Sequence, residues 1–326
     1  MVLPVLALAT TDYPDFTPLM LGITLGAYGL TQAILQIPLG LLSDRIGRQP
    51  VIIAGLLMFT VGSIVAALAD TMTGLVIGRA LQGTGAIAST LMALVADLTA
   101  EQNRSKAMAA IGGSIGFSFM LAMMLGPLLT TNFGLPGVFW LTAALGVIGI
   151  WITYFWVPKA ASMRRNREAM TDAQQIRGLL SESNLMRLNV GIFALHFALM
   201  AAFVAVPSML SEELDINGSN LSWVYLGLLG GGFFVMLPVM IMAEKFGYQK
   251  LVFVAAVALM ALTTAVLSSQ RGPLLTPLML LVFFAAFNLL EATLPSWLSK
   301  MCPVGNRGTA MGIYSTSQFF GAFAGG

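Results

Sequence analysis

Nine stretches of mostly apolar residues follow one another along the chain, and they constrain its fold more than any other feature. They cover approximately residues 18 to 42, 50 to 69, 73 to 97, 105 to 130, 136 to 157, 187 to 210, 221 to 243, 250 to 269 and 273 to 299. A helix of about 20 residues crosses the hydrocarbon core of a bilayer. With 57% hydrophobic and 9% charged residues, nearly every segment must contact lipid or another such segment. The pattern predicts an all-α polytopic membrane protein.

Two shorter apolar pieces lie at the ends of the chain. The first, MVLPVLALAT, is about half a span, and the last, GTAMGIYSTSQFFGAFAGG, is slightly short of one. The first piece lacks the basic segment of a secretory signal, so we interpret it as the tail of a helix that began upstream. We expect about eleven spans, the first and last incomplete, in a chain truncated at both ends.

Lysine and arginine indicate the orientation of the spans, because cytoplasmic loops hold an excess of them. If the loop at 43 to 49 is cytoplasmic, all 16 basic residues except Arg79 and Arg271 fall on that side. The opposite loops carry mostly aspartate and glutamate. We therefore expect the loops at 43 to 49, 158 to 186 and 244 to 250 to be cytoplasmic.

Two loop sequences recur at nearly one offset. SDRIGRQ begins at 43 and AEKFGYQ at 243, while NRSKAM begins at 103 and NRGTAM at 306. Both pairs lie on the predicted cytoplasmic side, which indicates a parallel repeat of six helices. The expected domains are an N-terminal bundle at 1–157, a cytoplasmic linker at 158–186 and a C-terminal bundle at 187–326 that lacks its last helix.

Three ionisable side chains stand out because they lie well inside predicted spans, away from the span ends: Arg79, His196 and Glu291. A charge near the bilayer centre costs roughly 2.5 to 3.5 kcal/mol on insertion scales, so a retained one usually has a partner or a task. For Arg79, we weigh a functional role against bonding to neighbouring backbone carbonyls. For Glu291, the alternatives are proton carriage and a structural tie to a neighbouring helix. Histidine side chains ordinarily gain and lose a proton near neutral pH, so His196 is a candidate for proton exchange. A lone buried histidine, however, is more often only hydrogen-bonded.

Other polar side chains share helix faces with one another at spacings of three or four residues. They are Gln82 with Arg79, Asn288 with Glu291, and Tyr28 with Gln32 and Gln36. These side chains either line a cavity or join helices through hydrogen bonds.

Several classes of protein do not fit the sequence. A net charge of +2, spread among apolar runs, argues against a nucleic-acid partner. One histidine and one cysteine, far apart in sequence, give no catalytic or metal-ligating spacing, and no phosphate-binding G-x-x-x-x-G-K-[ST] occurs. We expect no enzyme activity, no metal and no cofactor other than a proton as the coupling ion.

Three motifs resemble those of the major facilitator superfamily. GLLSDRIGRQP, beginning at Gly40, resembles the loop between the second and third helices of that family, and RALQGTG, beginning at Arg79, resembles its Arg-x-x-Gln-Gly motif. MLGPLL matches the antiporter Gly-Pro motif at Gly126 and Pro127, although threonines replace the usual glycine pair after it. The longer stretches GAYGLTQAILQIPLGLLSDRIGR and GTAMGIYSTSQF are similar to the YajR-type bacterial transporters within the superfamily.

The resemblance implies a gating role for the loop, with Arg45 as its first arginine. Gly40 and Gly47 permit close backbone approach and positive φ. By the family pattern, the Asp44 carboxylate faces the start of the eleventh helix, where a helix terminus favours an anion. Arg48 meets an acid that corresponds here to Asp97. This latch is expected to favour the outward-open state.

The resemblance also implies two six-helix bundles and secondary active transport by alternating access. We expect this transport to be coupled to protons. The apolar interior, rich in Met and Phe, favours a small hydrophobic or cationic solute and therefore efflux. We expect a monomer in the bilayer of a bacterial inner membrane. The alternative is a transport-inactive sensor or scaffold of the same fold.

Overall fold

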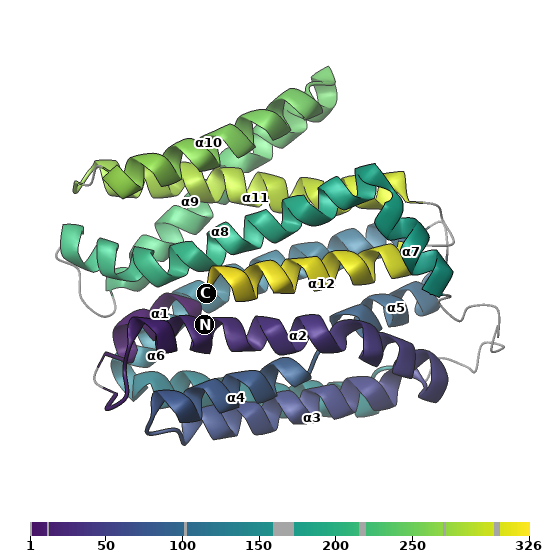
Figure 1. Ribbon diagram of the computed structural model, residues 1–326, viewed down its shortest axis with the longest axis horizontal. Helices are drawn as coiled ribbons and strands as arrows, with labels where there is room; N and C mark the ends of the chain where they lie inside the picture. The colour runs from purple at the N-terminus through teal and green to yellow at the C-terminus, as the bar shows by residue number, and fades with distance from the viewer. Residues whose placement is uncertain are drawn as a thin grey trace.

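A computed structural model describes residues 2–11, 13–100, 103–158, 173–214, 220–269, 272–302 and 307–326. Every element in these ranges is a helix, so the all-α prediction is confirmed. In chain order they are α1 (Leu3–Ala9), α2 (Pro18–Ile46), α3 (Arg48–Ala67), α4 (Met72–Thr84), α5 (Ala88–Leu98), α6 (Arg104–Phe155), α7 (Ala173–Ser181), α8 (Ser183–Leu214), α9 (Asn220–Phe246), α10 (Gln249–Ser269), α11 (Leu275–Met301) and α12 (Arg307–Gly325). Figure 1 shows most of them running side by side along the long axis of the molecule.

The turn between α2 and α3 has a counterpart between α9 and α10. Gly47 separates the first pair with φ of 100°, and Gly247 lies between the second pair with φ of 74°. Residues with a Cβ rarely adopt such angles, so glycine is the residue that permits these tight reversals. The two turns lie 200 residues apart, at the offset of the repeated loop sequence.

The structure breaks the predicted span at 73 to 97 into α4 and α5. Thr71 caps α4, and its Oγ1 accepts a hydrogen bond of 3.1 Å from the Gly74 N–H. The helix ends at Gly85, where a Cβ would lie 2.5 Å from the carbonyl oxygen of Gly55 on α3. The glycines favour a break because they are poor helix formers, and they allow α3 to approach the exposed backbone.

The spans predicted at 105 to 130 and 136 to 157 form the two parts of α6, which covers 52 residues in all. Gly134 interrupts it with φ of 66° and ψ of −178°, so the backbone turns there between two helical parts. By length and composition, seven described helices are able to span a membrane. The exact number of spans therefore stays a prediction.

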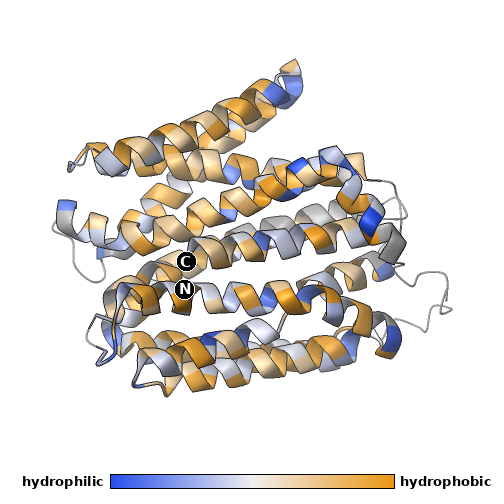
Figure 2. Cartoon of the chain, viewed as in Figure 1, coloured by the Kyte–Doolittle hydropathy of each residue, from blue (hydrophilic) through white to orange (hydrophobic). Residues whose placement is uncertain are grey.

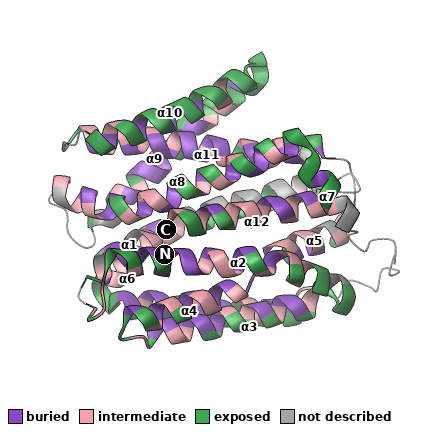
Figure 3. Ribbon diagram, viewed as in Figure 1, coloured by how far each residue is buried: buried purple, intermediate pink, exposed green. Residues whose placement is uncertain are grey.

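The buried core forms two clusters, one mainly within α1 to α4 and the second part of α6, the other mainly within α8 to α12. Phe203, Tyr225 and Phe284 are fully buried in the second cluster. Large apolar side chains are also exposed on the helices, whose ribbons carry mostly apolar colours in Figure 2. Among the long helices, α10 is the most exposed in Figure 3. An apolar outer surface fits helices that face lipid.

The helices α2 and α12 meet in the middle of the molecule, and α12 also packs on α8 (Figure 1). Glycines line the contact with α2. A Cβ on Gly26 would lie 2.8 Å from the Phe323 carbonyl oxygen, and one on Gly29 would lie 2.8 Å from that of Phe319. We call this contact the glycine seam. Since α2 and α12 come from opposite halves of the chain, the seam joins the two halves.

The predicted linker at 158–186 contains the short helix α7, which sequence reasoning missed. Leu179 is buried and packs with the core, whereas Leu180 beside it is exposed. The remainder of the linker, at 159–172, lies outside the described residues.

Candidate functional site

A buried polar network joins α2, α3 and α4 in the first half of the chain. Nη1 of Arg79 donates to Oε1 of Gln82 at 2.8 Å, and Nε2 of Gln82 donates to Oγ of Ser63 at 2.8 Å. The Arg79 Cζ lies 4.6 Å from the centre of the Tyr28 ring, within the range of a cation–π contact. Nε2 of Gln32 donates to the Tyr28 hydroxyl at 2.9 Å. Four residues singled out in the sequence therefore lie together.

The face of α2 also holds polar atoms without partners. Oε1 of Gln32 and both amide atoms of Gln36 are buried with no hydrogen-bond partner among the described residues. The backbone carbonyl of Gln36 accepts from Oγ of Ser89 at 3.0 Å, which fixes α2 against α5. Buried amides usually find a partner, so these atoms indicate a place for water or a polar ligand.

A second polar network joins α8, α11 and α12. Nε2 of Gln318 lies 2.8 Å from Nε2 of His196 and donates to Oε1 of Glu291 at 3.3 Å. Nδ1 of His196 lies 3.8 Å from Oε2 of Glu291. The Gln318 amide nitrogen is a donor toward both groups, so the neutral imidazole accepts at Nε2 and carries its hydrogen on Nδ1, facing the carboxylate. The structure thus brings together two predicted residues that come from different spans.

Sequence reasoning missed Ser63 and Gln318 as members of these networks. Gln318 and Tyr314 lie one turn apart on α12, and the buried Tyr314 hydroxyl has no hydrogen-bond partner among the described residues. The rule that identified Glu291, a polar side chain inside an apolar span, also applies to Gln318. Ser63 carries no such signal, because a serine in a span commonly bonds to its own helix, as Ser63 also does with the Phe59 carbonyl at 2.7 Å.

The loop motif also forms a defined cluster. Nε of Arg48 lies 3.1 Å from Oδ2 of Asp97, and their side chains are 17% and 31% exposed. Nη1 of Arg48 donates to Oγ of Ser43 at 2.6 Å, and Ser43 donates to the Gly40 carbonyl at 2.6 Å. A part-buried arginine thus ties the start of α3 to the end of α5 and to the last turns of α2.

The other predicted positions in this loop differ in what surrounds them. Gly40 lies close to α5, since a Cβ there would be 3.2 Å from Oγ of Ser89. Arg45 is exposed in the last turn of α2. Asp44 is also in α2, but its side chain, like the first residues of α12, lies outside the described part of the structure. The predicted contact between them stays a prediction.

Two further predicted elements lie apart from the networks. Gly126 and Pro127 are buried in α6, and their carbonyls each accept a 2.9 Å hydrogen bond, from Thr130 and Thr131 respectively. The threonines that replace the family's glycine pair thus bond back to the motif. Asn288 is half-buried one turn before Glu291, and within the described residues the Gln318 network does not include it.

A clamp absent from the predictions lies at the opposite end of α2 from the loop motif. Asp15 accepts hydrogen bonds from the backbone N–H of Met72 at 2.7 Å and of Thr73 at 3.1 Å, at the start of α4. These hydrogen bonds hold the pKa of the Asp15 carboxyl below its usual range, and the bond from the Met72 N–H contributes more than those from Thr73. The Tyr13 hydroxyl donates to the Ala69 carbonyl at 3.3 Å, so the α1–α2 loop is fixed to the α3–α4 turn.

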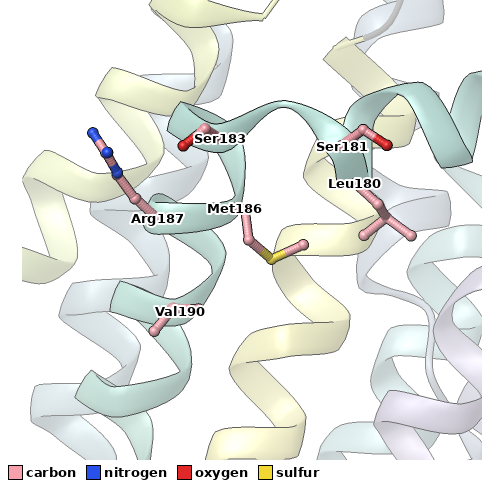
Figure 4. A pocket seen from close by; sticks show the side chains of 6 residues that line it. All are labelled: Leu180, Ser181, Ser183, Met186, Arg187 and Val190. Carbon is pink, nitrogen blue, oxygen red and sulfur yellow. The ribbon is translucent and has the colours of Figure 1, made fainter.

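A surface pocket lies where α7 turns into α8 (Figure 4). Its lining residues are Leu180, Ser181, Ser183, Met186, Arg187 and Val190. In the figure the polar groups point in different directions, and Ser181 is committed to the Arg177 carbonyl of its own helix at 2.8 Å. None of the residues singled out in the sequence lines this pocket.

Helices of membrane-spanning length, with buried polar networks inside them, define a polytopic membrane protein of the transporter class. The family model of the Major Facilitator Superfamily matches residues 1–326. The chain belongs to this superfamily and is a transporter of the YajR type within it.

The YajR assignment comes from a relative in Escherichia coli (strain K12), named inner membrane transport protein YajR. It is 46% identical over 329 residues, which cover 100% of this chain and 72% of the relative. An uncharacterised transporter of Buchnera aphidicola from Acyrthosiphon pisum is 35% identical over 100% of this chain and 84% of its own length.

Solved structures share the fold at low identity. A bacterial homologue of the human lysosomal transporter Spinster, inward-facing and unoccupied, has a TM-score of 0.77 at 14% identity and covers 99% of this chain and 76% of its own. A D-xylose–proton symporter has a TM-score of 0.69 at 16% identity, with 98% and 84% covered. These likenesses confirm the fold and carry no information on the solute.

Proposed function

We propose that the chain is a secondary active transporter that works by alternating access and exports a small hydrophobic or cationic solute in exchange for protons. We place it as a monomer in a bacterial inner membrane, with the loops at 43–49, 158–186 and 244–250 in the cytoplasm. A proton is the coupling ion, and no other cofactor takes part. The membrane and the solute are its partners, and it has no enzyme activity.

The observation that carries this proposal is the network of His196, Glu291 and Gln318. An imidazole and a carboxyl group are the side chains best suited to exchange a proton, and here they face each other at 3.8 Å inside membrane-length helices. They come from α8 and α11, and the bridging amide comes from α12. A proton bound by this network changes the bonds among three helices.

The position of α12 supports coupling between that proton and a movement of the two halves. Besides carrying Gln318, α12 packs on α8 within its own half and on α2 across the glycine seam. Changing the hydrogen bonds of Gln318 therefore acts on the helix that joins the halves. A shift of a few kcal/mol is enough to move such an equilibrium.

The cluster of Arg48 and Asp97 supports a gate at the predicted cytoplasmic side. Exposed ion pairs contribute about 0 to 1 kcal/mol, and partial burial raises this contribution modestly. A latch of that strength biases a conformational equilibrium without preventing exchange between states. Asp44 is proposed to join the latch, as the superfamily resemblance implies.

Reconstitution into proteoliposomes tests the proposed function. A pH-sensitive dye inside the vesicles should report proton movement when hydrophobic and cationic drugs are added, and Glu291→Gln should abolish it. Glu182→Gln, which alters an exposed carboxylate between α7 and α8, is the matched control and should leave it unchanged. Drug binding by the wild type with no proton movement would favour the alternative, a transport-inactive sensor.

A further inference from the structure

The guanidinium of Arg79 is a buried cation without a counterion in the described part of the chain. The residue is 7% exposed, and its nearest partners are the neutral Gln82 amide and the Tyr28 ring. The described carboxylates of the first half, Asp15, Asp70 and Asp97, lie in loops or near a helix end. A buried charge that lacks an opposite charge is costly, so its retention calls for an anion that comes and goes.

The hydrogen bonds of Arg79 leave one edge of the guanidinium unused. Nη1 is committed to Gln82, and Tyr28 covers one face of the plane. Nε is buried and has no hydrogen-bond partner among the described residues. The edge formed by Nε and Nη2 is a planar fork, and such a fork matches the two oxygens of a carboxylate.

The surroundings of this edge favour an anion with one charge over an anion with several. Gln32, one turn from Tyr28 on α2, has an unpartnered Oε1 that would accept from a solute hydroxyl or a bound water. Arg79 is the only basic residue in the interior of the spans predicted for this half, since Lys106 lies at the very end of its span. A multiply charged anion such as a sugar phosphate would need several cations, whereas a monocarboxylate needs one.

We propose that Arg79 is an anion-binding subsite, which takes the carboxylate of a hydrophobic organic acid between α2 and α4. This inference rests on the proposed transport function. Of the hydrophobic and the cationic solutes considered there, it selects a hydrophobic solute that carries a single acidic group. The guanidinium binds the carboxylate through Nε and Nη2, and the Tyr28 and Gln82 contacts hold it in orientation.

Three matched aromatic probes test the subsite on the purified protein in nanodiscs. They are 1-naphthoate, its neutral isostere 1-naphthamide, and 1-naphthylmethylammonium, with affinities measured by isothermal titration calorimetry. The wild type should bind naphthoate about ten- to a hundredfold more tightly than naphthamide, because one charge-assisted hydrogen-bonded pair contributes a gain in affinity of that size. Arg79→Gln should erase this preference, and Arg79→Lys should retain part of it. Arg187→Gln, a change of an exposed arginine, should leave it intact.

A second measurement keeps the inference testable if Arg79→Gln does not fold. Phenylglyoxal modifies accessible arginines, and peptide mass spectrometry of the wild type reports the modification of each. Naphthoate should protect Arg79 from the reagent, whereas naphthamide should not. Equal affinity for the two probes, or equal protection by them, would overturn the subsite and leave water as the partner of these groups.

The outcomes also separate this inference from the proposed function. Binding in nanodiscs needs no gradient, so naphthoate binding without any solute or proton flux in vesicles would overturn transport alone. Flux driven by naphthylmethylammonium, together with no preference for naphthoate, would overturn the anion subsite alone.

Discussion

The guanidinium of Arg48, the first residue of α3, is paired at 3.1 Å with the carboxylate of Asp97 near the end of α5. The pair sits beside the turn at Gly47, and Arg48 also donates to Ser43 on α2. Three helices of one half thus share a single charged group at the predicted cytoplasmic end. The first prediction concerns what this pair contributes.

Removing either charge of the pair should weaken the first half by a small, measurable amount. Arg48→Gln and Asp97→Asn should each reduce the free energy of unfolding by about 0.5 to 1 kcal/mol. In a double-mutant cycle, the second substitution should cost less once the first is present. Denaturant unfolding in detergent measures both. Full additivity would show that the two charges do not interact in solution.

A gate at this loop should affect transport more than stability. Asp44→Asn should insert into the membrane and fold as the wild type does, because the amide keeps the size of the carboxyl group. Its transport in the vesicle assay should fall severalfold, because the helix terminus it is proposed to face prefers an anion. Normal transport by this variant would reject the gate.

The clamp at Asp15 should respond to acid. Its pKa is lowered in the folded protein, so its contribution to stability is complete above the ordinary carboxyl value of about 4 and is lost as the pH falls through the lowered value. Asp15→Asn should therefore lower Tm at pH 7, and the difference from the wild type should shrink toward pH 3. Glu244→Gln is the control, and a constant difference across this range would contradict the clamp.

Gln318 should stabilise the second half through its two bonds. Gln318→Leu leaves part-buried acceptors on His196 and Glu291 without their donor, which should cost about 0.5 to 1.5 kcal/mol. Ser317→Ala is the matched control, because that hydroxyl bonds only to the Ile313 carbonyl in its own helix. In a Glu291→Gln background the cost of losing Gln318 should change. Equal costs for Gln318→Leu and Ser317→Ala would exclude the bridge.

Close packing of α3 on α4 should make Gly78 intolerant of any side chain. A Cβ there would lie 2.6 Å from the Ala66 nitrogen and 2.8 Å from its Cα. Gly78→Ala should therefore destabilise the protein by about 1 to 3 kcal/mol. At Gly227 a Cβ would meet nothing within 4 Å, so Gly227→Ala should be nearly neutral in the same unfolding measurement.

Hydrophobic length alone predicted the helical class of the fold and the positions of most helices. It failed at 73 to 97, where the chain stays apolar while its backbone leaves the helix. The interruption there comes from glycine, which adds little to a hydropathy average and much to backbone freedom. The number of residues in an apolar run says nothing of such breaks.

The sequence predicted which residues of a single helix belong to the candidate site. A charge in an apolar span identified Arg79, His196 and Glu291, and helical spacing added Tyr28 and Gln82. Contacts between helices were beyond that reasoning, because one sequence does not say which faces meet. The bridge through Gln318 and the bond from Gln82 to Ser63 needed the packed structure.

The glycine seam closes the space between α2 and α12 near the start of α2. At Gly26 and Gly29 the two helices lie so close that a Cβ on either glycine would be 2.8 Å from a carbonyl oxygen of α12. Under alternating access, a solute held between the halves has no exit past this contact. Release toward the end where α2 begins requires the two helices to separate first. A bulky residue in place of Gly26 would keep the two helices apart.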